Sequence, residues 1–189
     1  MISKGLDFDR VSLVGILQAD SMLNYPDFRA YEHAFMMMAQ VSGRAGRKGH
    51  RGLVLLQTKS PQLPVISQIV NNDFQTFFSA LLQERSAFGY PPFTRLIYVY
   101  LKHRHEAVVD HAARQLGLLL RQLFSTRVLG PDKPAVAKVK TLCIRKLVLK
   151  LEVGLDMVRV RQCLREVQQQ MASDKRFANV QIFYDVDPL

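Results

Sequence analysis

The amino-acid sequence predicts a mixed α/β fold, with a short parallel αβ layer near the N-terminus and a βαββαβ domain in the second half. Continuous apolar runs rich in β-branched residues, of which Val11–Leu17 is the first, are typical of buried parallel strands. Beyond residue 92, strand-like and helix-like apolar spacings alternate instead. Prolines at two points, 61–64 and 91–92, mark where the pattern changes. Three segments are therefore expected.

The first segment, residues 1–60, is expected to belong to a parallel sheet. After the strand Val11–Leu17, the polar stretch 24–27 predicts a loop, and Arg29–Val41 predicts a helix. The glycine-rich sequence SGRAGRKGHRG ends that helix, and Leu53–Gln57 predicts a second buried strand. A sheet of two strands is too small to be stable alone, so the segment indicates the truncated remnant of a larger domain.

The second segment, residues 61–92, is predicted to be a helical linker. Helices are expected at Val65–Asn71 and Phe74–Phe88. The sequence Gly89-Tyr90-Pro91-Pro92 stops the second helix, because proline cannot continue a helix and also restricts the residue before it. We therefore expect a domain boundary near residue 92.

The third segment, residues 93–189, is predicted to be a separate domain. Asp156 is a plausible N-cap for its second helix, and Gly130-Pro131 predicts a turn. The resulting order βαββαβ is that of the ferredoxin-like split βαβ fold. The strands are expected at Thr94–Lys102, Val136–Leu142, Ile144–Glu152 and Asn179–Val186, and the helices at His105–Phe124 and Asp156–Met171.

Composition narrows the class of protein. The chain has 189 residues, of which 48% are hydrophobic and 22% charged, an ordinary globular balance. No apolar run approaches the roughly 18–20 residues that span a bilayer, and the N-terminus lacks the layout of an export signal. Cys143 and Cys163 form no CxxC pair, which fits a reducing cytosol and predicts neither a disulfide framework nor a zinc site.

Charge indicates a polyanionic partner. The formal net charge is +10 and the sequence pI is about 9.9. Residues 93–189 hold seventeen Lys/Arg against nine Asp/Glu, a net of +8, whereas residues 1–60 hold eight against five, a net of +3. The basic character therefore lies mainly in the third segment, and nucleic acid is the expected partner.

The sequence Gln40-Val41-Ser42-Gly43-Arg44-Ala45-Gly46-Arg47 is the strongest sign of chemistry. Two glycines, Gly43 and Gly46, allow a tight turn after a helix, and Arg44 and Arg47 are spaced three apart. An arginine fork suits phosphate oxygens and can neutralise the charge that develops in phosphoryl transfer, as an arginine finger does. The alternative is a solvated basic loop, which the position of Gln40 at the end of an amphipathic helix makes less favoured.

A second basic stretch lies in the third segment. On paired strands its side chains could form a positive ribbon that binds DNA phosphates with affinity that falls steeply in salt. The alternative is a strand face exposed to solvent, whose lysines prevent the strand edge from pairing with another chain. Tyr98 and Tyr100 share one strand face and could stack on bases, although packing is the simpler interpretation. The predicted DNA-binding residues are Lys133, Lys138, Lys140, Arg145, Lys146 and Lys150.

These motifs together resemble those of the PriA-like replication-restart helicases of superfamily 2. Residues 40–47 are similar to helicase motif VI, and Met1–Phe8, followed at once by a strand, is similar to motif V. The resemblance covers the chain, through residues 24–32, 55–58, 84–85, 90–92, 128–131, 145 and 185–188.

The resemblance implies an ATP-driven 3′→5′ DNA helicase that recognises stalled replication forks and begins primosome assembly. Residues 1–60 would be part of its second RecA-like lobe, and residues 93–189 its ferredoxin-like C-terminal domain, which binds DNA and partners. Arg44 and Arg47 would reach ATP phosphates, and Gln40 would couple nucleotide state to the lobe interface. A nucleotide and DNA coupling role is implied for Lys4, Gly5, Asp7, Gly43 and Gly46.

The resemblance also implies cofactors and partners. ATP and Mg would act in the full-length enzyme, and zinc would bind only upstream of this chain. No GxxxxGKS/T sequence occurs here, so the isolated chain is expected to neither hydrolyse ATP nor hold a cofactor. Forked and single-stranded DNA, single-stranded DNA-binding protein and other primosome proteins are the implied partners, in a bacterial cytoplasm near the nucleoid, without a membrane.

Two other classes of function remain open from the residues. The chain could be a stand-alone basic nucleic-acid-binding module of ribosomal-protein type, in which the GRAGRKGHR loop simply holds phosphate. It could also be a structural scaffold, which would show no salt-sensitive binding to DNA.

Overall fold

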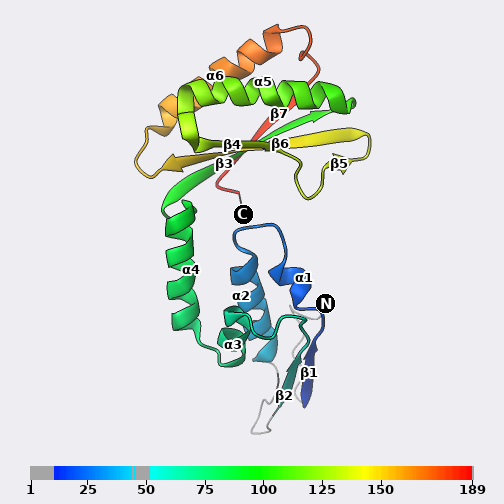
Figure 1. Cartoon of the computed structure of the whole chain (residues 1–189), viewed down its shortest axis with the longest axis vertical. Coiled ribbons are helices and arrows are strands. Elements are labelled where there is room, and N and C mark those ends of the chain that lie inside the picture. The colour runs from blue at the N-terminus through cyan, green and yellow to red at the C-terminus, as the bar shows by residue number, and fades with distance from the viewer. Residues whose placement is uncertain (1–10, 44, 46–51, 189) are drawn as a thin grey trace. The chain divides into compact units, whose positions relative to one another are not determined.

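The computed structural model describes residues 11–43, 45 and 52–188. It confirms the mixed α/β class and divides the chain into two compact units, Met1–Glu84 and Arg85–Leu189 (Figure 1). The division falls inside α4 (Phe74–Phe88), between the boundaries expected near residues 60 and 92. Within the described residues, no helix is long and apolar enough to cross a membrane.

Unit 1 is built on two short parallel strands. β1 (Leu13–Ile16) pairs in parallel with β2 (Leu53–Leu56), and Leu13 lies opposite Leu53. The parallel pairing confirms the prediction. The predicted burial was wrong on one face, because Leu13, Leu53 and Leu55 each expose more than half of their surface. The helices of this unit are α1 (Asp20–Leu23), α2 (Ala30–Ser42), α3 (Pro64–Val70) and most of α4.

The core of unit 1 forms where α2 meets α3, α4 and the end of β1. Phe35 of α2 stacks on Phe77 of α4 with ring centroids 4.4 Å apart, and Ile16 and Ile66 are buried in the same cluster. Stacked aromatic pairs add stability beyond the area that they bury. This packing, rather than the small sheet, therefore holds unit 1 together.

The end of α4 confirms the predicted stop. Gly89 has a φ of +59°, the backbone N–H of Tyr90 donates to the carbonyl of Arg85 (2.8 Å), and that of Gly89 donates to Ser86 (3.3 Å). This pair of bonds is a Schellman cap, whose left-handed residue is usually glycine because other side chains are strained there.

Unit 2 is an antiparallel sheet with two helices on one face (Figure 1). The strand order is β4-β6-β3-β7, β5 also pairs with β6, and every pairing is antiparallel. In chain order the elements are β3 (Thr94–His103), α5 (Glu106–Phe124), the short 3₁₀ helix η1 (Ser125–Arg127), β4 (Val128–Asp132), β5 (Lys138–Val139), β6 (Leu142–Glu152), α6 (Met157–Ser173) and β7 (Gln181–Val186).

The core of unit 2 lies between this sheet and α5 and α6. Val99 of β3 and Leu147 of β6 are fully buried against Leu116 of α5, and Leu164 of α6 belongs to the same cluster. The predicted cap of α6 is confirmed, because the Asp156 carboxylate accepts from the backbone N–H of Val158 at 2.8 Å. That bond satisfies a donor that the first turn of a helix leaves unpaired.

The structure corrects the prediction between residues 128 and 142. Gly130-Pro131 is not a turn but part of the edge strand β4, where the pairing with β6 shifts register between Leu129 and Asp132. Proline is tolerated at such an edge irregularity because its missing N–H breaks no central ladder bond. The predicted strand Val136–Leu142 is also wrong as bounded, since β5 holds only Lys138 and Val139, and the hairpin to β6 turns at residues 140–141.

Candidate nucleic-acid interface

Of the predicted nucleotide-site residues, the structure describes Gln40 and Gly43. Gln40 is exposed in the last turn of α2, and Gly43 follows as its C-cap, with its N–H bonded to the Ala39 carbonyl at 3.0 Å. Gly43 has a φ of −64°, a conformation that any residue adopts, so the end of the helix does not itself require glycine there. Outside the described residues lie Lys4, Gly5, Asp7, Arg44, Gly46 and Arg47.

The carboxylate of Asp20 ties together the segments that follow the two parallel strands. Its oxygens accept from the Thr58 hydroxyl (2.8 Å) and the Lys59 backbone N–H (3.0 Å). These bonds hold the pKa of Asp20 below its usual value of 3.8, and the bond from the Lys59 backbone has the larger effect. Because the carboxyl ends of parallel strands meet at one edge of a sheet, these two bonds hold the segment after β2 to the start of α1 at that edge.

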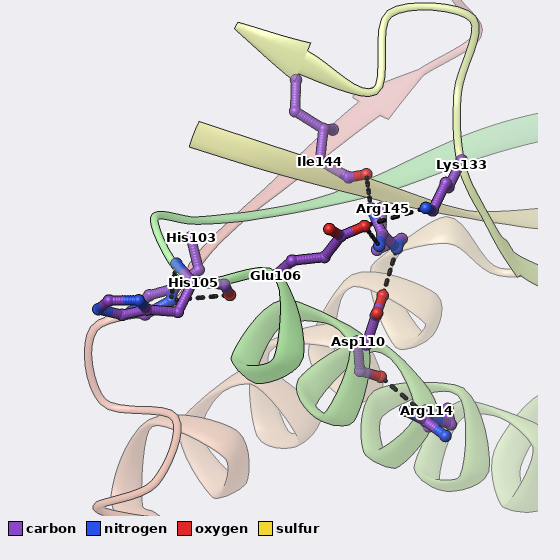
Figure 2. A network of polar contacts seen from close by, with 8 residues as sticks. All are labelled: His103, His105, Glu106, Asp110, Arg114, Lys133, Ile144 and Arg145. Carbon is purple, nitrogen blue, oxygen red and sulfur yellow. Dashed lines mark hydrogen bonds and ion pairs between the residues drawn. The ribbon is translucent and has the colours of Figure 1, made fainter. Parts of the chain in front are cut away.

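Arg145 is buried, although it was predicted to bind DNA. Only 4% of its surface is exposed, and Figure 2 shows its guanidinium between α5 and β6. It forms ion pairs with Glu106 (2.7 Å) and Asp110 and donates to the Ile144 carbonyl (2.9 Å). Its charge is therefore balanced inside unit 2 rather than presented on the surface.

Lys133 belongs to the same network (Figure 2). Its ammonium lies 2.9 Å from Glu106, which thus binds two cations. Bonds to Lys133 and then Arg145 lower the pKa of Glu106 from its ordinary 4.5. Lys133 itself is exposed, and its link to Glu106 attaches the loop after β4 to the start of α5.

Lys150 is half-buried and contacts the end of α4. Its ammonium donates to the Phe88 carbonyl (2.7 Å) and lies 3.8 Å from the centre of the Tyr90 ring. Burial lowers the pKa of Lys150 from 10.5. These contacts hold the turn after α4 against β6, so part of the predicted ribbon is used to build unit 2.

The remaining three predicted residues lie at two places in the same sheet. Lys138 and Lys140 are exposed at the β5–β6 hairpin, and Lys140 occupies the turn with a φ of +52°. Lys146 points to the sheet face opposite the helices, where its ammonium lies 4.3 Å from the centre of the Tyr98 ring. Lys102, which the charge pattern did not single out, is on that face too, 4.8 Å from the ring of Phe183.

A groove with three arginines lies between α6 and the β3–β7 side of the sheet. Its volume is about 440 Å³. The floor is apolar and includes Ile97 and Leu164, whereas the rim carries Arg95, Arg161 and Arg165. Arg95 forms an ion pair with Asp187, which balances its charge. The positive charge at the rim therefore comes mainly from Arg161 and Arg165. Sequence spacing did not identify this site, because its lining comes from three separate elements.

The histidines near the start of α5 contact each other. The backbone N–H of His105 donates to Nδ1 of His103 at 3.0 Å, and Figure 2 shows both rings beside the Glu106 network. In the part of the chain that the structure describes, no three His, Cys, Asp or Glu side chains gather as metal ligands.

Comparison with known proteins gives the family. The model for the primosomal protein N C-terminal domain matches residues 86–189, which coincide with unit 2 but for one residue. Over its whole length the chain is 32% identical to the replication restart protein PriA of Bacillus subtilis, covering 23% of it, and to that of Synechocystis sp., covering 22%. It is 41% identical over 74% of its length to the PriA of Treponema pallidum.

The chain thus spans about a quarter of the length of the curated relatives that it matches. The family model covers more than half of the chain, and its boundaries agree with an independently packed unit. The chain therefore belongs to the PriA family of replication restart proteins and contains the family's C-terminal domain.

Proposed function

We propose that this chain works as part of an ATP-dependent 3′→5′ DNA helicase that recognises stalled forks and restarts replication, and that unit 2 is its DNA- and partner-binding domain. The observation that carries the proposal is the match of residues 86–189 to the PriA C-terminal domain. Relatives that match the whole length of this chain are named replication restart proteins. We place the protein in the bacterial cytoplasm, associated with the nucleoid.

The detailed folds are part of this proposal. In unit 2, the strand order β4-β6-β3-β7 with both helices on one face supports a ferredoxin-like domain, because β3 lies between β6 and β7 and the two split βαβ units interleave. In unit 1, the parallel β1–β2 pair supports part of a second RecA-like lobe. The exposed Leu13, Leu53 and Leu55 side chains are where the rest of that lobe would pack in the full-length protein.

The nucleotide would bind between two lobes of the full-length enzyme. Arg44 and Arg47 would contact ATP phosphates, Gln40 would transmit the nucleotide state, and Mg would bind on residues outside this chain. Lys4, Gly5, Asp7, Gly43 and Gly46 would couple this site to DNA. Zinc would bind only upstream. Because no GxxxxGKS/T sequence occurs here, the isolated chain would bind DNA and partners without hydrolysing ATP.

A substitution in the full-length enzyme tests this assignment. Arg47→Ala should abolish DNA-dependent ATP hydrolysis, because the transition-state charge loses its arginine, while fork binding stays within about twofold. Lys175→Ala, an exposed cation of unit 2, is the control and should leave hydrolysis unchanged. If Arg47→Ala lost DNA binding and ATP hydrolysis in parallel, Arg47 would contact a DNA phosphate rather than an ATP phosphate, and the assignment would be wrong.

The DNA-binding surface would use lysines at the β5–β6 hairpin, which are exposed, and a half-buried lysine of β6. Lys138, Lys140 and Lys146 are proposed to contact phosphate, whereas Lys133, Arg145 and Lys150 mainly hold the unit together through the contacts above. Fluorescence anisotropy with a labelled fork should show binding that weakens steeply with salt. A titration without binding even at low salt would remove the DNA role and favour a scaffold.

The arginine groove is proposed to bind the acidic C-terminal tail of single-stranded DNA-binding protein. An apolar floor with Arg161 and Arg165 at the rim suits a segment that combines carboxylates with apolar side chains. A labelled peptide with that tail should bind the chain, and Arg161→Ala should weaken binding about tenfold or more. Equal binding by wild type and Arg161→Ala would place the peptide elsewhere. Other primosome proteins would bind the remaining surface of this domain.

A further inference from the structure

The sheet of unit 2 has a second face that carries aromatic rings. Ile97, Val99 and Leu101 of β3 are buried under the helices, and successive residues of a strand alternate between faces. Figure 1 shows α5 and α6 together on one face of this sheet. Tyr98, Tyr100 and Lys102 therefore point to the opposite face.

Strand pairing brings residues from three strands into one row on this face. Tyr100 of β3 lies directly opposite Lys146 of β6 and Phe183 of β7. Phe183 exposes 48% of its surface, although it lies in a strand. Its neighbours Ile182 and Tyr184 pack into the core, which fixes the Phe183 ring on the outer face.

The next row adds a second ring. Tyr98 lies opposite Val148 of β6 and Asp185 of β7, and its ring is nearly perpendicular to that of Tyr100, with centroids 6.2 Å apart. Leu129 of β4, opposite Val148, extends the apolar surface and is 45% exposed. Rings and aliphatic side chains thus form a continuous surface across β4, β6, β3 and β7.

Cations lie directly against these rings. The Lys146 ammonium is 4.3 Å from the centre of the Tyr98 ring, and the Lys102 ammonium is 4.8 Å from that of Phe183. Asp132 of β4, opposite Lys146, and Asp185 of β7, opposite Tyr98, place two carboxylates in the same rows, and Lys102 and Lys146 are the cations there that can reach phosphate. Stacking of a base on a ring stabilises about as much as a half-buried cation–π contact or more, so a base can displace the ammonium towards its own phosphate.

We propose that this surface, the aromatic platform of Tyr98, Tyr100, Lys102, Lys146 and Phe183, binds single-stranded DNA by stacking unpaired bases on its rings. The rings offer π-faces to bases of any sequence, and the lysines reach the backbone phosphates. Duplex DNA cannot use the rings, because its bases are already stacked and paired. The inference rests on the proposed DNA-binding function and identifies the kind of strand that this face takes.

The ring of Phe183 provides the main test, with the whole chain and labelled DNA. Phe183→Leu keeps an apolar side chain but removes the ring, and should weaken binding of oligo-dT about five- to 150-fold, the range found for one stacked base. Affinity for a duplex of equal length should change less than about twofold, since duplex binding depends on phosphate contacts. Phe183→Tyr keeps the ring and should bind oligo-dT like wild type.

Two matched controls separate stacking from general damage. Phe78→Leu makes the same change at a 42% exposed ring of α4 and should leave oligo-dT affinity unchanged. Lys146→Gln should lower the slope of log affinity against log salt by about 0.7 on oligo-dT, as loss of one phosphate contact does, whereas Lys175→Gln should not. Thermal unfolding of each variant checks that unit 2 remains folded.

A fluorescent base reports the stacking directly. An oligo-dT with one 2-aminopurine should lose fluorescence on binding wild type and regain it with Phe183→Leu. The platform is refuted if Phe183→Leu and Tyr100→Leu both bind oligo-dT like wild type while DNA binding itself persists. A chain that binds no DNA would instead refute the proposed function. Tighter, ring-dependent binding of oligo-rU would overturn DNA as the occupant.

Discussion

The guanidinium of Arg145 joins β6 to the first turns of α5, because it binds Glu106 and Asp110 while donating to the Ile144 carbonyl. We expect Arg145→Met to lower the free energy of unfolding by about 1–3 kcal/mol, since buried charge-assisted bonds are lost. Urea denaturation measures this loss. DNA affinity of the folded variant should stay close to that of wild type.

Lys133→Met is the matched control for this change. It also removes one cation from Glu106, but its side chain is 64% exposed, so unfolding should shift by no more than about 0.5 kcal/mol. If Arg145→Met weakened DNA binding and left stability unchanged, Arg145 would have to reach DNA after all.

The ion pairs of Glu106 also predict how stability depends on pH. Lys133 and Arg145 lower its pKa in the folded state below 4.5, so the unfolded chain binds the proton more readily. The stabilisation is therefore complete above the unfolded pKa and is lost as pH falls through the lower folded pKa. Glu106→Gln should be less stable than wild type at pH 7, and the difference should shrink below about pH 4.

Urea denaturation across this pH range checks the prediction. Glu166→Gln is the control, because that exposed carboxylate bonds to the amide of Gln162 rather than to a cation. A Glu106→Gln difference that stayed constant from pH 7 to pH 3 would mean that the carboxylate contributes little through its charge.

The burial of Arg145 could have been predicted from the sequence. Leu147, Leu149 and Leu151 alternate with Lys146 and Lys150, and Arg145 is in phase with the leucines. Counting basic residues along a stretch ignores this period of two. What the sequence could not provide was the partner, because Asp110 lies in a helix far from β6 along the chain.

Among elements, α6 depends on the cap at its first turn. Asp156 accepts from the backbone N–H groups of Val158 and Arg159. We expect Asp156→Ala to lower the free energy of unfolding by about 1 kcal/mol, because both donors then lose a partner in the protein, whereas Asp156→Asn keeps an acceptor and should cost much less. Equal losses for both variants in chemical denaturation would show that the charge, not the cap bond, is what matters.

The elements that the sequence predicted well have a strong period or clear end signals. Predicted Phe74–Phe88 agrees with α4, and His105–Phe124 differs from α5 by one residue. The failures lie at the β4–β5 edge, where Gly130-Pro131 resembles a turn but sits in a strand. Edge strands tolerate proline, and whether a strand is an edge depends on pairing with distant residues, which local patterns do not contain. The aromatic platform was partly hidden for the same reason, since only the register brings Phe183 beside Tyr100.

On the scale of the whole molecule, the two units differ in how completely they cover their sheets. Unit 2 buries one face of its sheet under α5 and α6, whereas the two strands of unit 1 leave Leu13, Leu53 and Leu55 on an exposed face. Sequence indicated the small sheet and its need for further strands, but not which leucines would remain uncovered. Within the described ranges, β1 and β2 pair only with each other, and clustered exposed leucines next to such strand edges favour association.

We therefore expect the chain to self-associate through β1 and β2 as its concentration rises. Size-exclusion chromatography with light scattering should give a mass above 21.6 kDa, and Leu55→Lys should shift the protein towards that monomer mass, because a charge on this face opposes burial. Leu118→Lys places the same charge at a 56% exposed leucine of α5 and should leave the mass unchanged. A shift with Leu118→Lys but not with Leu55→Lys would place the contact on unit 2, and the exposed face of unit 1 would then have no part in assembly.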